Sequence, residues 1–113
     1  MKLEIEESRN DGRATLRLSG VMNIHTAMAL RKRLKALLDD ARPDDALREV
    51  RVDMRGVDFI DSAGIAVLVE GLQWSRKEKG RRFVLVGLSE NVRDIFELAK
   101  LDTVFDIEEA AAA

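Results

Sequence analysis

The sequence predicts an α/β fold, a mixed β-sheet with helices packed mainly on one face. Segments in which apolar and polar residues alternate, as in strands, are interspersed with segments whose apolar residues recur at helical spacing. Together they give the order ββαβαβαβ over 113 residues, the usual size of one domain. Each strand–helix–strand unit should be a right-handed parallel crossover. The first three strands each have a polar side, so one face of the sheet should stay partly open.

An antiparallel hairpin is expected at the start of the chain. Leu3 and Ile5 alternate with glutamates, and a second alternating segment covers 14–19. Asn10-Asp11-Gly12 lies between the two segments, and these residue types accept the positive φ of a tight turn. Two paired strands should therefore precede the first helix.

A helix, a strand and a second helix should follow the hairpin. After Gly20 a loop leads to Thr26, the expected N-cap of a helix that ends before Pro43. A third strand is predicted over 50–55, and the second helix should run from Asp61-Ser62 to Gly80. The apolar residues at helical spacing in the first helix are Ala27, Leu30, Leu34, Leu37 and Leu38.

The remaining third of the chain should add a strand, a helix and a short strand. Residues 83–86 are apolar on both sides, which is typical of a central strand. Ser89 should cap the third helix, and 103–107 should form the last strand. We expect a single domain over 1–113, with its core at about 3–107 and a frayed tail at 108–113.

Two features allow a structural or a functional interpretation. Trp74 lies on a second apolar face of the second helix and could contact the core or a partner, and core packing is favoured. The basic stretch from Arg76 to Arg82 lies at the end of that helix. Because the helix dipole favours cations there, a structural role is favoured over nucleic-acid binding.

Composition narrows the function classes. Nineteen basic and 21 acidic residues give a net charge of −2, so no general attraction to nucleic acid or anionic membranes is expected. No cysteine and only one histidine, His25, leave no cysteine or histidine metal cluster. The longest apolar run, Ala63 to Val69, is far too short to cross a bilayer. We expect a cytoplasmic, non-enzymatic protein with no cofactor or metal.

The most informative segment joins the third strand to the second helix. Asp61 and Ser62 open this helix, where main-chain N–H groups lack partners and the dipole is positive. The Ser62 oxygen could cap these groups, or carry a phosphate held by them. Gly64 would leave room for a partner's backbone. The alternative is that Asp61 or Ser62 is an ordinary N-cap and Gly64 a packing glycine.

The chain resembles the STAS domain, the sulphate transporter and anti-sigma factor antagonist family, from about Leu3 to Ile107. Besides the order of elements, three segments carry the resemblance: Val52-Asp53-Met54, Phe59-Ile60-Asp61-Ser62-Ala63-Gly64, and Val86-Gly87-Leu88-Ser89 with the helix that follows.

The resemblance implies a phosphorylation-switched binding module, an anti-sigma factor antagonist. In stand-alone bacterial members the serine after the aspartate, here Ser62, is phosphorylated by an anti-sigma factor that is a serine kinase of the GHKL-type ATPase fold. The unphosphorylated protein binds this kinase, phosphorylation breaks the complex, and a phosphatase resets it. The implied partner-binding residues are Asn23, His25, Thr26, Asp61, Ser62, Ala63 and Gly64.

The chain departs from the family pattern at two positions. Many members have Gly-x-Leu-Asp before the first helix, where this chain has Gly20-Val21-Met22-Asn23. The charge near Ser62 is therefore different. Many members also have a second serine after the phosphorylated one, where this chain has Ala63. A competing phosphate acceptor is thereby removed.

Three other functions remain as alternatives. A related STAS branch is the subunit of an Mla-type phospholipid transporter, which docks on an ABC ATPase and need not be phosphorylated. A small hydrolase could use Ser62 with His25, but the sequence has no glycine-rich nucleophile elbow. Asp58 and Asp61 could form a carboxylate pair for metal binding or acid–base catalysis, but no third ligand is evident.

Overall fold

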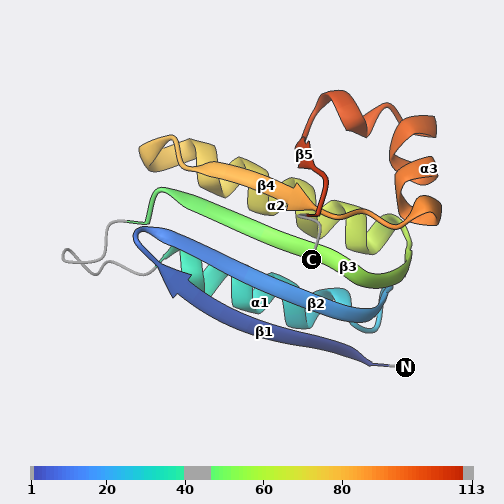
Figure 1. Cartoon of the computed structure of the whole chain (residues 1–113). Helices are drawn as coiled ribbons and strands as arrows, with labels where there is room; N and C mark the ends of the chain where they lie inside the picture. Colours follow the sequence, from blue (N-terminus) through green and yellow to red (C-terminus); the bar gives the residue numbers. More distant parts are fainter. Residues whose placement is uncertain (1, 40–46, 111–113) are drawn as a thin grey trace.

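Five strands form one sheet in the order β1-β2-β3-β4-β5 (Figure 1). The computed structural model describes residues 2–39 and 47–110. β1 pairs with β2 in antiparallel fashion, and the other neighbouring strands are parallel. The strands are β1 (Leu3–Asn10), β2 (Arg13–Met22), β3 (Glu49–Ile60), β4 (Arg82–Val86) and β5 (Asp106–Glu108).

The α-helices connect the parallel strands. They are α1 (Ala27–Leu38), α2 (Ser62–Lys79) and α3 (Glu90–Leu98), and a 3₁₀ turn η1 (Leu101–Thr103) precedes β5. Because every crossover leads to the next strand in the same direction, right-handed connections place the helices on one side. Figure 1 shows α1 and α2 behind the sheet and α3 beside the end of β3 and β4. The predicted mixed α/β fold is confirmed.

The core lies between the sheet and this helical layer. Alternate residues of β2 and β3, such as Leu16 and Val52, are fully buried, whereas Arg13 and Arg17 on the other side of β2 are exposed. Trp74 packs against the core as expected, and the Arg31 guanidinium lies 5.5 Å from its ring centre. Within residues 2–39 and 47–110, no helix is both long and apolar enough to span a bilayer.

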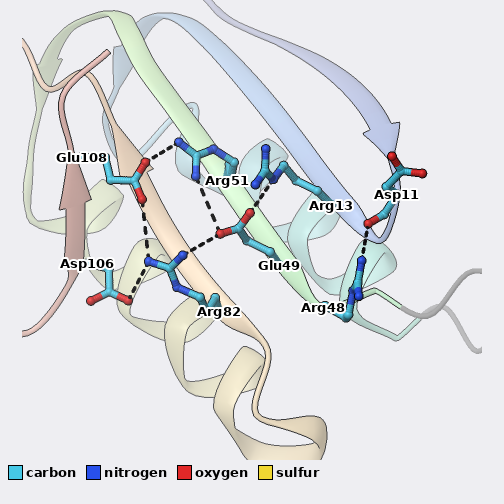
Figure 2. A network of polar contacts seen from close by, with 8 residues as sticks. All are labelled: Asp11, Arg13, Arg48, Glu49, Arg51, Arg82, Asp106 and Glu108. Carbon is cyan, nitrogen blue, oxygen red and sulfur yellow. Dashed lines mark hydrogen bonds and ion pairs between the residues drawn. The ribbon is translucent and has the colours of Figure 1, made fainter. Parts of the chain in front are cut away.

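The sheet face that lacks helices carries a network of charged side chains (Figure 2). Glu49, whose side chain is 11% exposed, pairs with Arg13, with Arg82 at 3.0 Å and with Arg51 at 3.7 Å. Arg51 also donates to Glu108 at 2.7 Å. This hydrogen bond lowers the pKa of the Glu108 carboxyl. The network therefore fastens β5, a strand of three residues, to the middle of the sheet.

Two arginines of the basic stretch Arg76 to Arg82, at the end of α2, have a structural role. Arg81 is buried and donates to the carbonyl oxygens of Leu38 and Leu47, both at 3.0 Å. Arg82 belongs to the charged network. These contacts support the structural interpretation of this stretch.

Several boundaries differ from the expected ones. β2 continues through Gly20 to Met22, because Gly20 at φ 119° lets the β1 backbone pass close by. Residues 83–86, by contrast, form the interior strand that was expected, because β4 pairs with β3 and β5 and all four residues are buried.

The end of the chain also differs from the prediction. The last strand starts at Asp106, not at 103, because 101–103 form the 3₁₀ turn. The start expected for the frayed tail, at 108, is too early. Glu108 lies in β5, and Glu109 pairs with Arg93 at 3.1 Å. Residues 111–113, like Pro43, lie outside the described residues.

Candidate functional site

The ends of β2 and β3 bring the two segments of the expected site together. Parallel strands end at the same edge of a sheet, and α1 and α2 both begin at this edge (Figure 1). The main-chain N–H of Asp61 donates to the carbonyl oxygen of Met22 at 3.0 Å. The loop at 23–26 is therefore joined directly to the start of α2.

Asp61, not Ser62, caps α2. Asp61 has an extended backbone, and its Oδ1 accepts hydrogen bonds from the N–H groups of Ala63 at 2.9 Å and Gly64 at 3.2 Å. Ser62 is the first helical residue, exposed, and its hydroxyl makes no hydrogen bond within the part of the chain that the structure describes. Of the two residues that the sequence allows as the N-cap, the structure selects Asp61, because its carboxylate accepts from the amides that a Ser62 cap would use. The hydroxyl is left facing solvent.

Gly64 faces the core and leaves no room for a partner. A Cβ at this position would lie 2.8 Å from Ile60 Cγ1 and 3.0 Å from Met22 Cβ. The absence of a side chain therefore lets α2 approach the ends of β2 and β3. The predicted role in admitting a partner's backbone is corrected to helix–sheet packing. Ala63, beside it, is half-buried.

The loop before α1 is held by Asn23 and Thr26, which are both buried. Asn23 Oδ1 accepts from the N–H groups of His25 at 2.9 Å and Thr26 at 3.1 Å. The Thr26 hydroxyl donates to the Val21 carbonyl at 2.6 Å and accepts from the Asn23 N–H at 2.9 Å.

The expected N-cap residue of α1 is confirmed in position but not in its side-chain bonding. Thr26 occupies the N-cap position, but its side chain makes no capping bond to the helix. The side-chain acceptor of this loop is the neutral amide oxygen of Asn23, so the loop is held without a carboxylate.

Exposed apolar side chains occur on the segments around Ser62, and sequence reasoning missed them. Ile24 is 69% exposed, Met28 52% and Phe59 49%. Met28 lies off the buried stripe of α1, which could have been read from the helical spacing. Phe59 points away from the core because Ile60, its neighbour in β3, points inward. With His25 and Asp58, also exposed, these side chains make a mixed apolar and polar surface.

The geometry gives little support to the two chemical alternatives. Asp61 Oδ1 accepts from two main-chain N–H groups, so this carboxylate already serves the fold as the N-cap of α2. Among the residues described, no three His, Asp or Glu side chains gather as metal ligands would. No hydrogen bond joins Ser62 to His25 in the described part of the chain, so the serine–histidine arrangement of a hydrolase is not formed there.

Comparison with known proteins finds relatives that are named anti-sigma factor antagonists. BtrV of Bordetella bronchiseptica, assigned as an anti-sigma factor antagonist, is 33% identical over 116 residues, which cover 100% of this chain and 93% of BtrV. The anti-sigma-B factor antagonist of Bacillus subtilis is 23% identical over 107 residues, covering 95% of this chain and 92% of that protein.

Solved structures agree on the fold. An anti-sigma factor antagonist from Mycobacterium paratuberculosis superposes with a TM-score of 0.78 at 24% identity, covering 94% of this chain and 85% of the other. The phosphorylated form of SpoIIAA from Bacillus gives 0.72 at 16% identity, covering 96% and 92%. The family model described as "Mlab, STAS domain" matches residues 5–108. The chain therefore belongs to the STAS domain family.

Proposed function

We propose that this protein is an anti-sigma factor antagonist switched by phosphorylation of Ser62. Unphosphorylated, it binds an anti-sigma factor that is a serine kinase of the GHKL-type ATPase fold, and phosphorylated, it releases this partner. A phosphatase restores the binding form. The proposal is supported by BtrV and the Bacillus subtilis relative, which are both named anti-sigma factor antagonists. Each is similar to this chain over nearly its full length.

The observation that carries the proposal is the free hydroxyl of Ser62 on an already capped helix. A kinase can reach this hydroxyl without breaking a hydrogen bond of the fold. Phosphorylation adds a charge of about −1.5 to −2. At a helix N-terminus such a charge is favourable by about 0.3–1 kcal/mol, so the domain should stay folded.

The phosphate acts on the complex instead of on the fold. A docked partner would expel water from around Ser62 and from the Asp61 carboxylate beside it. Two unit charges about 4 Å apart repel by about 4 kcal/mol at an effective dielectric of about 20. A loss of about 2.8 kcal/mol already weakens binding about a hundredfold.

The exposed side chains around Ser62 are the proposed contacts with the partner. Ile24, Met28 and Phe59 offer apolar area, and His25 lies in the adjoining loop. The buried residues of the expected set, Asn23, Thr26 and Gly64, take a different part. Asn23 and Thr26 fix the loop before α1, and Gly64 lets α2 pack on the sheet. Asp61 and Ala63 lie at the start of α2.

The test uses the purified protein with a candidate anti-sigma kinase and ATP. We expect mass spectrometry to find one phosphate, on Ser62, and binding to fall about a hundredfold. Ser62→Ala should bind constitutively and Ser62→Glu poorly, with similar melting temperatures. Ser89→Ala is the matched control, because Ser89 also begins a helix but its hydroxyl caps Val92. An unmodified Ser62, with both Ser62 variants binding as wild type does, would refute the switch.

A second candidate function is a subunit of an Mla-type phospholipid transporter. It is favoured by the description of the matching family model, which names Mlab. The same exposed surface would then dock on an ABC ATPase, and Ser62 would stay unmodified. Co-purification with an ABC ATPase, insensitive to ATP-dependent phosphorylation, would favour this function over the first.

A further inference from the structure

The outward side of α3 presents an exposed leucine in a charged hollow. Val92 and Phe96 hold this helix on the core. On its other side Asp94, Glu97 and Leu98 line a hollow of about 380 Å³. Leu98 is 85% exposed, more than any other large apolar side chain in the described part of the chain.

The acidic side chains near this leucine are only partly balanced by Arg93 and Lys100, which flank them in the sequence. Asp94 and Glu97 make no ion pair among the described residues, and the nearby Arg93 is held by Glu109 at 3.1 Å. The last turn of α3 contains no basic residue. The C-terminal end of a helix is the negative end of its dipole, where cations, not carboxylates, are favoured.

Both features disfavour the isolated domain and would favour a complex. An exposed leucine gains from being covered, and Glu97, in the last turn of α3, lies at the negative end of the helix dipole, where a cation is favoured. Asp94, one turn earlier, adds a second negative charge. We propose that the α3 surface, defined by Asp94, Glu97 and Leu98, binds a basic amphipathic segment of a protein partner. An apolar side chain of this segment lies against Leu98, and a lysine or arginine lies between the two carboxylates.

The negative charge selects among the classes of partner. Anionic lipid headgroups and nucleic-acid phosphates are repelled by Asp94 and Glu97, whereas a basic peptide is attracted. This proposal is independent of Ser62, since α3 follows β4 and shares no residue with the candidate site. A Ser62 variant should bind the basic segment as wild type does.

In the experiment, a synthetic helical peptide with a leucine stripe flanked by lysines is added to the full chain. The amide NMR signals of the chain report binding. We expect shifts confined to α3 and η1, and binding that weakens as salt rises. Leu98→Ser and Glu97→Gln should each weaken binding at least tenfold. Glu90→Gln, the same charge change at the start of α3, is the matched control and should bind as wild type does.

Three results would overturn the proposal. The first is the absence of saturable binding at millimolar peptide, or shifts that lie elsewhere. The second is non-specific attraction. It would be shown by equal binding of a peptide in which glutamates replace the lysines, or by equal losses of affinity in Glu90→Gln and Glu97→Gln. The third is self-association of the wild type that Leu98→Ser abolishes, because the occupant would then be a second copy of this chain.

Discussion

Gly64→Ala distinguishes helix–sheet packing from a direct contact with a partner. The added methyl group would lie 2.8 Å from Ile60 Cγ1, 3.0 Å from Met22 Cβ and 3.2 Å from the Met22 carbonyl oxygen. Two of these atoms belong to the main chain or are bonded directly to it. They cannot rotate away as the end of a flexible side chain could. The helix or the strand ends must therefore shift.

The expected magnitude follows from two opposing terms. Overpacking of this kind costs about 1–3 kcal/mol. Alanine recovers up to about 1 kcal/mol of helix propensity relative to glycine. We expect a net loss of about 1 kcal/mol for Gly64→Ala, and a larger one for Gly64→Val, which adds two more methyl groups to the same contact. Ala66→Val, on an exposed position of α2, should cost only about 0.5 kcal/mol of propensity.

The assay is urea unfolding of each variant together with its affinity for the anti-sigma partner. With a slope of about 1–2 kcal/mol per molar urea, a loss of 1 kcal/mol moves the midpoint by about 0.5–1 M. Folded Gly64→Ala should bind the partner within a few-fold of wild type. Unchanged stability combined with a tenfold loss of affinity would refute the packing argument and restore Gly64 to the contact surface.

Three further predictions concern stability, and one concerns catalysis. Asp61→Ala should lower the free energy of unfolding by about 1 kcal/mol through loss of the N-cap. Asp61→Asn keeps an acceptor and should lower it much less, and thermal unfolding of both variants measures the difference. Arg81→Met should cost about 2–4 kcal/mol in urea, because two buried carbonyls lose a charged donor, and a loss below 1 kcal/mol would contradict this. The pKa of Glu108 is lower in the folded than in the unfolded state, so its stabilisation is complete above its ordinary value of 4.5 and is lost as the pH falls through the lowered value. Glu108→Gln should therefore flatten the fall in stability measured between pH 6 and about pH 3. Finally, no turnover of ester, phosphate or nucleotide substrates is expected, and an activity that disappears in Ser62→Ala would revive the hydrolase.

The architecture could be predicted because each element repeats a simple pattern. Alternation marked β2, and helical spacing marked α1, so the order and the half-open sheet followed. The pattern fails inside β3, where the residue opposite Arg17 is Asp53 but the residue opposite Ser19 is Gly56. This shift inserts one extra residue into β3, and a second shift, between Gly20 and Val21, inserts another. The two shifts together restore the alternation at Phe59 and Ile60, whereas Val57, between them, is buried at a position that counting from Val50 would place outside.

The roles of single residues at the site were harder to predict for another reason. A serine, threonine, aspartate or asparagine near a helix start can each act as the cap, and the sequence gives no distance to choose between them. The sequence left Asp61 and Ser62 both open as the cap of α2, and the structure selects Asp61. At α1 the predicted Thr26 holds the N-cap position, but the side-chain acceptor of this loop is Asn23. Likewise a glycine in the first turn suits both a buried and an exposed contact, and only the position of Met22 decides for Gly64.

The two borders of the sheet bear on aggregation. A strand with one unpaired side can recruit a strand of another molecule and so start an aggregate. β1, at one border, has eight residues but exposes Glu4, Glu6 and Glu7. Glu7 is paired with Arg9 and Arg33, so the repulsion that opposes the approach of a second β1 comes mainly from Glu4 and Glu6. β5, at the other border, has only three residues and offers too short a template. Neutralising the three glutamates should therefore make this protein prone to edge-to-edge assembly while its core stays unchanged.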